Sequence, residues 1–383
     1  MRDEIRNGLR DEVRDDGRRE ARHEVRDDGR HGVRDGLRAD VQHDTAGRRP
    51  AVLLAMGPGV AERLLTGRHR DRLTALARTD PRLIAHDLES PTPAVESALA
   101  TAETLLTCWG APPLTAGALA RAPRLRAVVH AAGSVKHHMT DACWERGIAV
   151  SSAASANALP VAEYTLAAIL FAGKRVLPSA RRYARLRTGH DWAGELSDAG
   201  NYRRTVGIVG ASRIGRRVIE LLRPFELRVL LHDPYIGDAE AAELGAVRTG
   251  LDELCAAADI VSVHAPELPA TRRLIDGRRL ALMRDGATLI NTSRGSLIDE
   301  AALLPELVSG RLYAVLDVTE PEVPPAGSPL YTLPNVLLTP HIAGSLGGEL
   351  HRLADRALDE LERYGKGLPF AHPVRAEDLG RSA

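Results

Sequence analysis

Aromatic residues are scarce in this chain. Phe, Trp and Tyr make up 3% of its 383 residues, whereas hydrophobic residues as a whole make up 44%, so the core that the sequence can build is aliphatic. Because few aromatic side chains alternate with basic ones, a base-stacking surface for single-stranded nucleic acid is not expected. The 51 Lys and Arg residues equal the 51 Asp and Glu residues, so no net charge draws the chain to nucleic acid or to an anionic membrane.

Cysteine is also rare. The three cysteines, Cys108, Cys143 and Cys255, are widely spaced and form no CxxC pair. This argues against a disulfide framework and against a zinc site, and it suits a reducing compartment. The adjacent histidines His137 and His138 are expected to point apart and have no evident third ligand, so a solvated turn is favoured over a metal site. We therefore expect no metal.

Long hydrophobic runs are missing as well. The longest nearly apolar stretch, residues 161–173, contains Glu163 and is too short to span a bilayer. The chain begins with charged rather than apolar residues, so a secretory signal is not expected. These absences predict a soluble, cytoplasmic protein with no membrane and no nucleic acid among its partners.

Residues 1–48 form a charged, low-complexity segment. Between residues 5 and 44 the sequence repeats every four residues, with Arg in the second place of nearly every repeat. Such a repeat allows Asp/Glu–Arg pairs on a helix, but its apolar stripe drifts by about 40° per repeat and its glycines disfavour a helix. Dense charge and low hydrophobicity favour disorder or a transient helix. The segment is an extension without a role in chemistry, which we favour, or else an interaction tail or a weak arm for an acidic partner.

From residue 49 onward the sequence has the pattern of a globular α/β protein. Short apolar runs alternate with helical stretches, which predicts parallel sheets covered by helices on both faces. A long helical pattern, opened by Pro160 and kinked or broken at Pro178, separates two groups of runs. The expected strands are residues 51–56, 104–108, 127–130 and 148–150 in the first group, and residues 206–209, 228–232, 246–248, 260–264, 288–291, 314–317 and 336–338 in the second.

These patterns divide the chain into four segments. The charged tail (residues 1–48) precedes a smaller, flavodoxin-like α/β substrate domain (residues 49–155). A nucleotide-binding domain (residues 156–341) with a doubly wound parallel Rossmann sheet follows. The last segment, residues 342–383, contains a helix whose apolar stripe needs another surface to cover. We expect this helix to return to the substrate domain.

The nucleotide-binding prediction rests on TVGIVGASRIG, residues 205–215, and on the strand RVLLHD that ends at Asp233. A buried strand leads into a turn bracketed by Gly210 and Gly215 and then into a helix, an arrangement that binds a pyrophosphate. Ser212 replaces the second glycine of G-x-G-x-x-G, where its hydroxyl either crowds the phosphate or donates to it. An ordinary strand–helix connection is the alternative. Because a carboxylate repels a 2′-phosphate and accepts from ribose hydroxyls, Asp233 predicts NAD rather than NADP.

Three polar residues that follow strands of the second group are candidate catalytic residues. Arg294, Glu320 and His341 come after three strand ends, where ligands bind in doubly wound sheets. Singly, each is as easily a surface cation, a solvated carboxylate or a structural histidine; behind a nucleotide motif, the catalytic interpretation is favoured. Arginine binds a carboxylate with two hydrogen bonds, histidine exchanges a proton near neutral pH, and a neighbouring carboxylate favours the imidazolium. This set suits hydride transfer to a keto acid.

Residues 125–344 resemble the D-isomer-specific 2-hydroxy acid dehydrogenases, the family of D-3-phosphoglycerate dehydrogenase, glyoxylate/hydroxypyruvate reductase and formate dehydrogenase. The motifs occur in the order of the family: TVGIVGASRIG and HDP, VHAP and TRRLI, INTSRGSLIDEAAL, LDVTEP, and TPHIAG. The resemblance is weaker over residues 51–124 and absent from the charged tail.

The resemblance implies a role for each matching residue. Arg294 binds the substrate carboxylate and polarises the carbonyl, His341 is the acid–base, and Glu320 pairs with His341. A turn of the substrate domain offers backbone N–H groups to the substrate carboxylate. This turn consists of Ala132, Gly133 and Ser134, and the cofactor contacts are Gly210, Ser212, Arg213, Ile214, Gly215, Asp233, Ala265, Ser293, Asp317 and Gly344.

The implied activity is NAD-dependent interconversion of a small 2-keto acid and a D-2-hydroxy acid, of the phosphoglycerate or hydroxypyruvate/glyoxylate type. Formate oxidation is less favoured, because that branch lacks a carboxylate at the place of Glu320. Lys136 stands where the substrate-domain turn of the family has a carboxylate, so the identity of the acid stays open. The alternative is an NAD-sensing regulatory protein without turnover.

The family usually dimerises through the nucleotide domain, and residues 185–201, with Trp192, are expected in that contact.

Overall fold

The computed structural model describes residues 48–379 of the chain. The charged repeats lie outside this part, and so does nearly all of the segment predicted as residues 1–48. The described residues form two sheets, one of six strands and one of seven, with helices between successive strands. The predicted α/β class with two sheets is confirmed.

The first sheet has the strand order β13-β5-β4-β3-β1-β2. All pairs are parallel except that of β13 with β5. Its central strands are buried along their whole length, which accounts for their aliphatic sequences. Threonines cap three of the connecting helices by accepting a backbone hydrogen bond from the first helical turn. The elements are β1 (Val52–Ala55), α1 (Val60–Leu64), α2 (Gly67–Leu76), β2 (Ile84–Ala85), α3 (Pro93–Thr101), β3 (Thr104–Thr107), α4 (Ala116–Arg121), β4 (Ala127–His130), α5 (Asp141–Glu145), β5 (Ala149–Ser152) and β13 (Pro373–Val374).

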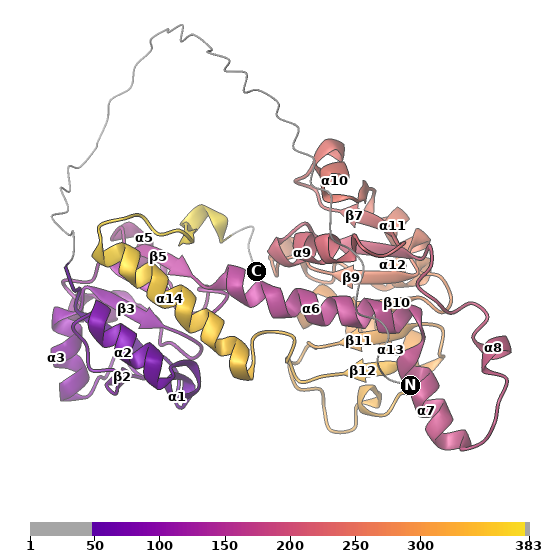
Figure 1. The fold of residues 1–383 in the computed structure, drawn as a ribbon, viewed down its shortest axis with the longest axis horizontal. Coiled ribbons are helices and arrows are strands. Elements are labelled where there is room, and N and C mark those ends of the chain that lie inside the picture. Colours follow the sequence, from indigo (N-terminus) through magenta and orange to yellow (C-terminus); the bar gives the residue numbers. More distant parts are fainter. Residues whose placement is uncertain (1–47, 380–383) are drawn as a thin grey trace, which may run out of the picture. The chain divides into compact units, whose positions relative to one another are not determined.

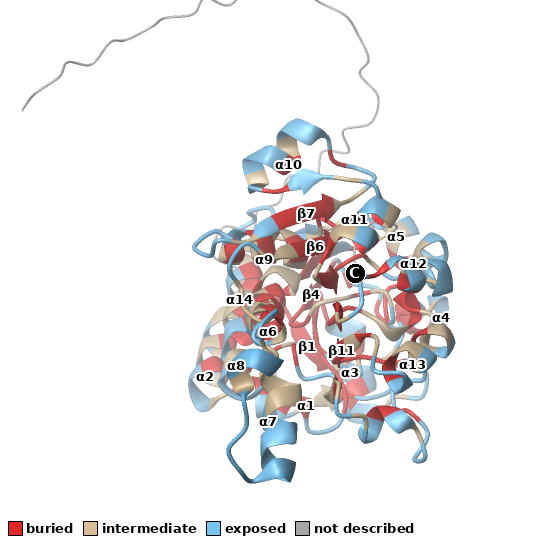
Figure 2. Ribbon diagram, turned by 90° about the vertical axis from the view of Figure 1, so that its right-hand side faces the viewer, coloured by how far each residue is buried: buried red, intermediate tan, exposed pale blue. Residues whose placement is uncertain are grey.

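The second sheet has seven parallel strands in the order β12-β11-β10-β9-β6-β7-β8 (Figure 1). The chain extends the sheet from β6 through β7 and β8 and then returns to the other side of β6 at β9. Strands β6 and β9 therefore form the topological switch point, beside which doubly wound sheets bind ligands. Figure 2 shows β6, β7 and β11 in the buried interior with exposed helix surfaces around them. The elements are β6 (Thr205–Val209), α9 (Arg213–Leu222), β7 (Arg228–His232), α10 (Asp238–Leu244), β8 (Val247–Arg248), α11 (Leu251–Ala257), β9 (Ile260–Val263), η1 (Pro269–Thr271), α12 (Gly277–Leu282), β10 (Thr288–Asn291), η2 (Gly295–Leu297), α13 (Glu300–Val308), β11 (Tyr313–Leu316), η3 (Pro329–Tyr331) and β12 (Val336–Leu338).

Helix α6 (Ala154–Gly173) connects the two sheets. The long helical pattern predicted here begins and breaks at other residues than expected. Pro160 lies inside α6 rather than opening it. The run ends before Pro178, because Arg175 adopts a left-handed backbone conformation with a φ of 53°. Pro178 then lies in the first turn of α7 (Val176–Leu186), where its missing N–H has no helical partner to lose. The short helix α8 (Trp192–Glu195) follows.

Among residues 48–379, α6 is the one helix that is long and apolar enough to cross a membrane by length and composition alone. Half of its apolar window is buried inside the protein. Ala162, Ala168 and Ile169 pack with Val206 and Ile208 of β6. Helix α6 is thus a core helix of the second sheet.

Helix α14 (Leu350–Gly365) follows the second sheet and η4 (Gly347–Glu349) in the chain but packs on the first sheet, alongside α1 and α2 (Figure 1). The predicted apolar stripe is buried there. Beyond it, the buried Glu360 side chain accepts hydrogen bonds from the backbone N–H groups of Ala371 and His372, each at 2.9 Å. These contacts align the chain for the pairing of β13 with β5, before η5 (Ala376–Asp378).

Candidate active site

The carboxyl ends of the strands of the second sheet lie at one edge, because all seven strands are parallel. This edge brings predicted cofactor residues and predicted catalytic residues together, although they are far apart in the sequence. From one side of the sheet to the other, the residues that follow its strands are Asp233 after β7, Gly210 after β6, Ala265 beyond β9, Ser293 and Arg294 beyond β10, Asp317 after β11, and His341 and Gly344 beyond β12.

The turn between β6 and α9 requires glycine at two places. Gly210 has a φ of 103°, and a Cβ atom there would lie 2.7 Å from the backbone nitrogen of Ala265. A Cβ atom on Gly215 would lie 2.0 Å from the carbonyl oxygen of Gly210. The turn is therefore packed tightly against the end of β9, and α9 begins with Arg213 and Ile214 directly behind it. Such a turn at a helix start is suited to a pyrophosphate.

Ser212, which replaces the second glycine of the motif, caps helix α9. Its Oγ accepts a hydrogen bond from the Gly215 N–H at 3.3 Å, and its backbone is extended, as at a helix N-cap. The Ser212 hydroxyl therefore caps the helix that it begins, and both crowding of the phosphate and donation to it stay predictions.

Replacing Ser212 by Ala should destabilise the protein by about 1 kcal/mol, and replacing it by Gly should cost only a few tenths of a kcal/mol, because glycine is itself tolerated at an N-cap. Neither change should alter the Kd for NADH. Denaturant unfolding and a fluorescence titration with NADH check the two expectations. A Ser212→Ala protein of unchanged stability that binds NADH about tenfold more weakly would show that the hydroxyl contacts the cofactor.

The Asp233 carboxylate lies beside the glycine turn. Its Oδ2 accepts a hydrogen bond from the Ala211 N–H at 2.7 Å, and its Oδ1 accepts one from the Tyr235 N–H at 2.8 Å. Each carboxylate oxygen can accept a further hydrogen bond. The group can therefore still receive ribose hydroxyls while its charge opposes a 2′-phosphate.

The turn that carries Arg294 is held by Asn291, the last residue of β10. The buried Asn291 side chain accepts a hydrogen bond from the Ser293 N–H at 3.0 Å and donates one to the Arg294 carbonyl at 2.8 Å. Ser293 Oγ donates to a β9 carbonyl at 2.7 Å. A Cβ atom on Gly295 would lie 2.1 Å from the carbonyl carbon of Thr319, so this turn is also pressed against the chain beyond β11. Asn291 was not among the predicted site residues, because its type alone is typical of any turn.

The Arg294 guanidinium is partly exposed and has a carboxylate near it. Its Nη1 donates to the Ser293 carbonyl at 2.6 Å, and its Nε lies 4.0 Å from Glu267 Oε2. Glu267 Oε1 accepts a hydrogen bond from Ser296 Oγ at 2.5 Å. Lys136, from the loop after β4, is within electrostatic range: burial and then the Arg294 charge lower its pKa, and Glu267 opposes this shift. The positive charges of Lys136 and Arg294 therefore interact.

Asp317 holds the loop that carries His341. Its buried carboxylate accepts hydrogen bonds from Thr339 Oγ1 at 2.7 Å and from the backbone N–H groups of Ile342 and Ala343 at 2.8 and 2.9 Å. The His341 N–H donates to the Asp317 carbonyl at 2.9 Å, and His341 has a left-handed φ of 55°. Asp317, predicted as a cofactor contact, thus fixes the backbone around the candidate acid–base.

The partner of His341 is Glu322 and not Glu320. His341 Nδ1 lies 2.6 Å from Glu322 Oε1, whereas both Glu320 oxygens accept hydrogen bonds from the Arg272 guanidinium, at 2.8 and 3.0 Å. The predicted pairing of Glu320 with His341 is therefore wrong. The segment TEPE has a glutamate on either side of Pro321, and only the path of the chain past this proline brings the second one to the histidine.

The predicted substrate turn follows β4. Gly133 and Ser134 line a cavity of about 360 Å³, partly open to solvent, and Arg213 at the start of α9 lines it too. Ala132 is buried directly before them. The cavity therefore joins the predicted substrate turn to the predicted pyrophosphate turn.

Asn157, in the first turn of α6, lies between this turn and the histidine loop. A Cβ atom on Gly133 or on Gly344 would lie 3.5 Å from the Asn157 side chain. Asn157 Oδ1 accepts a hydrogen bond from the Ser345 N–H at 3.1 Å. It was not among the predicted residues, since a lone asparagine in a helical stretch carries no catalytic signal.

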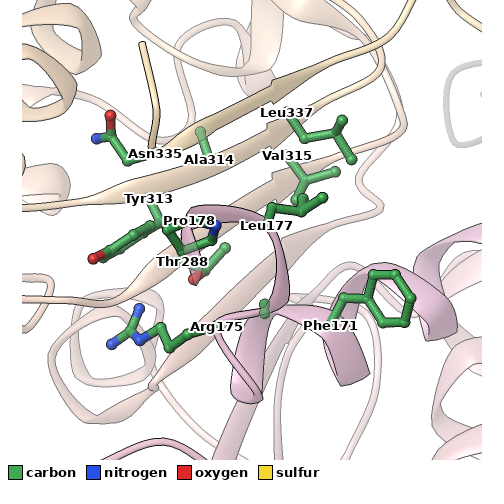
Figure 3. Close-up of a pocket in the computed structure, with 11 residues that line it drawn as sticks. Phe171, Arg175, Leu177, Pro178, Thr288, Tyr313, Ala314, Val315, Asn335 and Leu337 are labelled. Carbon is green, nitrogen blue, oxygen red and sulfur yellow. The ribbon is translucent and has the colours of Figure 1, made fainter. Parts of the chain in front are cut away.

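A second cavity, of about 330 Å³, lies at the opposite edge of the second sheet, where β10 and β11 begin (Figure 3). Its walls are mostly apolar and come from α6, α7 and strands β10 to β12. Arg175 lies over the ring of Tyr313, 4.4 Å from the centroid. This cavity lacks the convergent polar groups of a hydride-transfer site, so the carboxyl edge is the candidate active site.

Metal and thiol chemistry find no support in residues 48–379. No group of three or more His, Cys, Asp or Glu side chains in that range is arranged to hold a metal ion. The three cysteines are buried, and burial raises the pKa of Cys108 to about 12 and that of Cys255 to about 11. Such thiols are poor nucleophiles at neutral pH.

Comparisons with known proteins identify the family that this chain resembles. Residues 167–343 match the NAD-binding domain of the D-isomer specific 2-hydroxyacid dehydrogenases. The chain is 36% identical over 298 residues to D-3-phosphoglycerate dehydrogenase of Mycobacterium bovis, a match that covers 77% of this chain and 51% of that protein. It is 34% identical over 256 residues to glyoxylate reductase of Aeropyrum pernix, covering 65% and 76%. The solved NADPH-dependent glyoxylate/hydroxypyruvate reductase of Sinorhizobium meliloti has a TM-score of 0.67 at 25% identity, over 87% of this chain and 100% of that one.

The two sheets and the glycine turn at the switch point define a doubly wound dinucleotide-binding protein with a second, mostly parallel sheet. The chain belongs to the D-isomer specific 2-hydroxyacid dehydrogenase family. It spans about half the length of the phosphoglycerate dehydrogenases that it matches. Cofactor use differs within this family, since the matched domain binds NAD and the Sinorhizobium reductase depends on NADPH.

Proposed function

We propose that this chain is a dehydrogenase that uses NAD to interconvert a small 2-keto acid and the corresponding D-2-hydroxy acid, of the phosphoglycerate or hydroxypyruvate/glyoxylate type. The observation that carries the proposal is the 2.6 Å contact between His341 and Glu322, at the edge that also holds Arg294 and the glycine turn. One strand separates β10 from β12, so their ends lie about 10 Å apart. Side chains on the loops after these two strands can therefore reach the same small acid.

The residues at this edge fit a dinucleotide. Gly210 and Gly215 allow the close packing of the turn at these two positions, and α9 begins there with its N–H groups. The Asp233 carboxylate stands at the end of β7, where the ribose of the adenosine lies in such sheets. NADH bound there supplies a hydride to the carbonyl carbon of the keto acid.

His341 supplies the proton of the reduction. Its Nδ1–H donates to Glu322, which leaves Nε2–H of the imidazolium for the substrate oxygen. As the carbonyl oxygen becomes an alkoxide, it takes this proton, and the neutral ring stays held by Glu322. In the oxidation, neutral Nε2 accepts the hydroxyl proton, and the Glu322 carboxylate stabilises the imidazolium that forms.

Arg294 and the substrate turn orient the acid. The guanidinium binds the substrate carboxylate with two hydrogen bonds and polarises the adjacent carbonyl. Backbone N–H groups of residues 132–134 receive the same carboxylate from the other side. Lys136, close to Arg294, adds a second positive charge, which favours an acid with a further anionic group such as a phosphate.

Asp233 should set a preference for NADH over NADPH, because its carboxylate repels the 2′-phosphate. Asp233→Ser should lower the ratio of kcat/KM for NADH to that for NADPH by about a hundredfold, since a like-charge contact costs several kcal/mol. Asp238→Ser, an exposed carboxylate at the start of α10, is the matched control and should leave the ratio unchanged. A wild-type protein that prefers NADPH would contradict this role of Asp233.

The proposed activity is tested with a panel of 2-keto acids, namely glyoxylate, hydroxypyruvate, 3-phosphohydroxypyruvate and pyruvate. Oxidation of NADH is followed by absorbance, and the product is analysed for its D configuration. Turnover of at least one acid to its D-hydroxy acid is expected. If NADH binds tightly but no acid is turned over, the NAD-sensing regulatory protein becomes the better interpretation.

We also propose a cytoplasmic homodimer joined through the nucleotide domain. Helix α7 has no buried residue, and its Tyr183 and Leu186 are 59% and 38% exposed. Tyr183 packs edge-on against Trp192 with ring centroids 5.9 Å apart, within or next to residues 185–201. Such an exposed apolar group is suited to a second copy of the chain. Light scattering should give the mass of two chains; the mass of one would contradict the proposal.

The two sheets favour the domain division proposed from the sequence. We propose a substrate domain over residues 49–155 and a nucleotide domain over residues 156–341. The last segment, residues 342–383, returns to the substrate domain through α14, whose apolar side chains pack with β1, β3 and β4.

A further inference from the structure

Three buried polar side chains lie beneath the predicted substrate turn. Thr107 is the last residue of β3, His130 is the last residue of β4, and His138 lies in the loop beyond the turn. They are 1%, 3% and 3% exposed. A solvated turn was expected at residues 137 and 138; this is wrong for His138, because its ring packs against His130 with centroids 4.6 Å apart.

Thr107 connects the two histidines. Its Oγ1 lies 2.9 Å from His130 Nδ1 and 3.4 Å from His138 Nε2. The Ser134 backbone raises the pKa of His130 against the effect of burial, as a carbonyl that faces the ring N–H does. One assignment of donors satisfies every contact: His138 Nε2–H donates to Thr107 Oγ1, the Thr107 hydroxyl donates to His130 Nδ1, and His130 Nε2–H donates to the Ser134 carbonyl.

The His130 ring must be neutral for this assignment, because its Nδ1 accepts, and the surroundings of both rings favour the neutral form. Burial, and next the charge of His138, lower the pKa of His130 well below its ordinary value. Burial, and next the charge of His137, lower the pKa of His138 to about 4. At neutral pH His130 Nδ1 is therefore free to accept from Thr107.

The backbone on both sides of the turn is fixed as well. The Ala153 N–H donates to the His130 carbonyl at 2.9 Å, and the Leu114 N–H donates to the His138 carbonyl at 2.8 Å. Gly133, Ser134 and the buried Val135, which lie between these two histidines, form part of the cavity wall. The hydrogen-bonded side chains thus lie directly behind the wall that faces Arg213.

We propose that Thr107, His130 and His138 are positioning residues that hold the turn of residues 132–134 in the conformation that receives the substrate carboxylate. The inference rests on the proposed function, because it takes this turn as part of the substrate site. Burying three polar side chains costs free energy that aliphatic residues on these strands would not, and a fully satisfied buried network fixes a single geometry. The backbone that it fixes is the one at Ser134.

Thr107→Val tests the proposal, because valine has the same shape without the hydroxyl. With NADH bound, the Kd for oxalate, a stable planar carboxylate probe, should rise about tenfold. The KM for the best keto acid of the panel should rise to a similar extent, while kcat and the Kd for NADH change less than about twofold. Thr107→Ser retains the hydroxyl and should restore oxalate binding.

Thr104→Val is the matched control, since Thr104 is buried at the other end of β3. It should leave the Kd for oxalate unchanged even where it lowers the melting temperature. Equal effects of Thr104→Val and Thr107→Val on oxalate binding, or an unchanged Kd for oxalate in a folded Thr107→Val protein, would overturn the proposal.

Two further measurements apply if Thr107→Val does not fold or if no keto acid is turned over. If Thr107→Val does not fold, His138→Leu removes the other end of the network and should weaken oxalate binding, whereas His138→Gln retains a donor and should not. If no keto acid is turned over, the proposed activity fails, but the oxalate measurement still applies. A wild-type protein that does not bind oxalate would overturn the positioning role itself.

Discussion

The variant His341→Ala is expected to lose about a thousandfold in kcat, because a positioned acid–base contributes on the order of 10² to 10⁴ in rate. The His341 side chain is 45% exposed, and its loop is held by the Asp317 carboxylate rather than by the ring. Stability and the Kd for NADH should therefore stay close to wild type. Steady-state kinetics on the best keto acid and a fluorescence titration with NADH check both parts.

The two glutamates beside Pro321 make this expectation more specific. Glu322→Gln removes the carboxylate that stabilises the imidazolium, so kcat should fall by about a hundredfold. Glu320→Gln is the matched control: it weakens an exposed pair with Arg272, which contributes little, and kcat should change less than about twofold. The opposite order, with Glu320→Gln impaired and Glu322→Gln active, would show that the His341–Glu322 contact is not the catalytic one. Full turnover by His341→Ala would contradict the whole mechanism.

Local patterns were sufficient to predict the sheets of this protein. The strands of both sheets are short aliphatic runs, and buried parallel strands are read directly from such runs. The two-residue strands β2 and β13 were missed, because so short a segment has no periodicity. The break between α6 and α7 was misplaced for a different reason. The left-handed backbone conformation of Arg175 ends the first helix, and no residue type in the sequence indicates it. A proline suggests a break from the sequence alone, even in the first turn of a helix, where it interrupts no hydrogen bond.

The residues of the candidate site also fall into two groups, those that the sequence pattern could place and those that it could not. Residues that follow a predicted strand by a few positions, such as Arg294 and His341, could be placed at the ligand edge from the strand pattern alone. Glu322 could not, because the loop beyond β11 decides which glutamate reaches His341, and loop paths depend on close contacts such as that of Gly295 with the Thr319 backbone. The N-cap role of Ser212 could not be predicted either, because the G-x-G-x-x-G motif compares this position with a glycine and not with an N-cap residue.

Arg294→Ala should lower kcat/KM by about a thousandfold, through a higher KM and a lower kcat together. Two hydrogen bonds to a charged carboxylate, each worth about 1.5–3 kcal/mol, are lost, and the carbonyl is no longer polarised. Arg294→Lys keeps the charge without the planar fork and should recover about tenfold of this loss. Arg278→Lys is the matched control: Arg278, on α12, forms an exposed pair with Asp252 of α11, and its replacement should leave both constants unchanged.

The separate effects of Arg294→Ala on KM and on kcat show how Arg294 acts. A change that raises KM alone removes binding that is equal in the ground state and the transition state, whereas a fall in kcat shows an interaction that strengthens as the carbonyl oxygen gains charge. The Asn291 side chain and Gly295 fix the Arg294 backbone, so the guanidinium is placed before substrate arrives, and the kcat effect is expected. A rise in KM with unchanged kcat would restrict Arg294 to anchoring the carboxylate and would leave His341 as the only residue acting on the substrate oxygen.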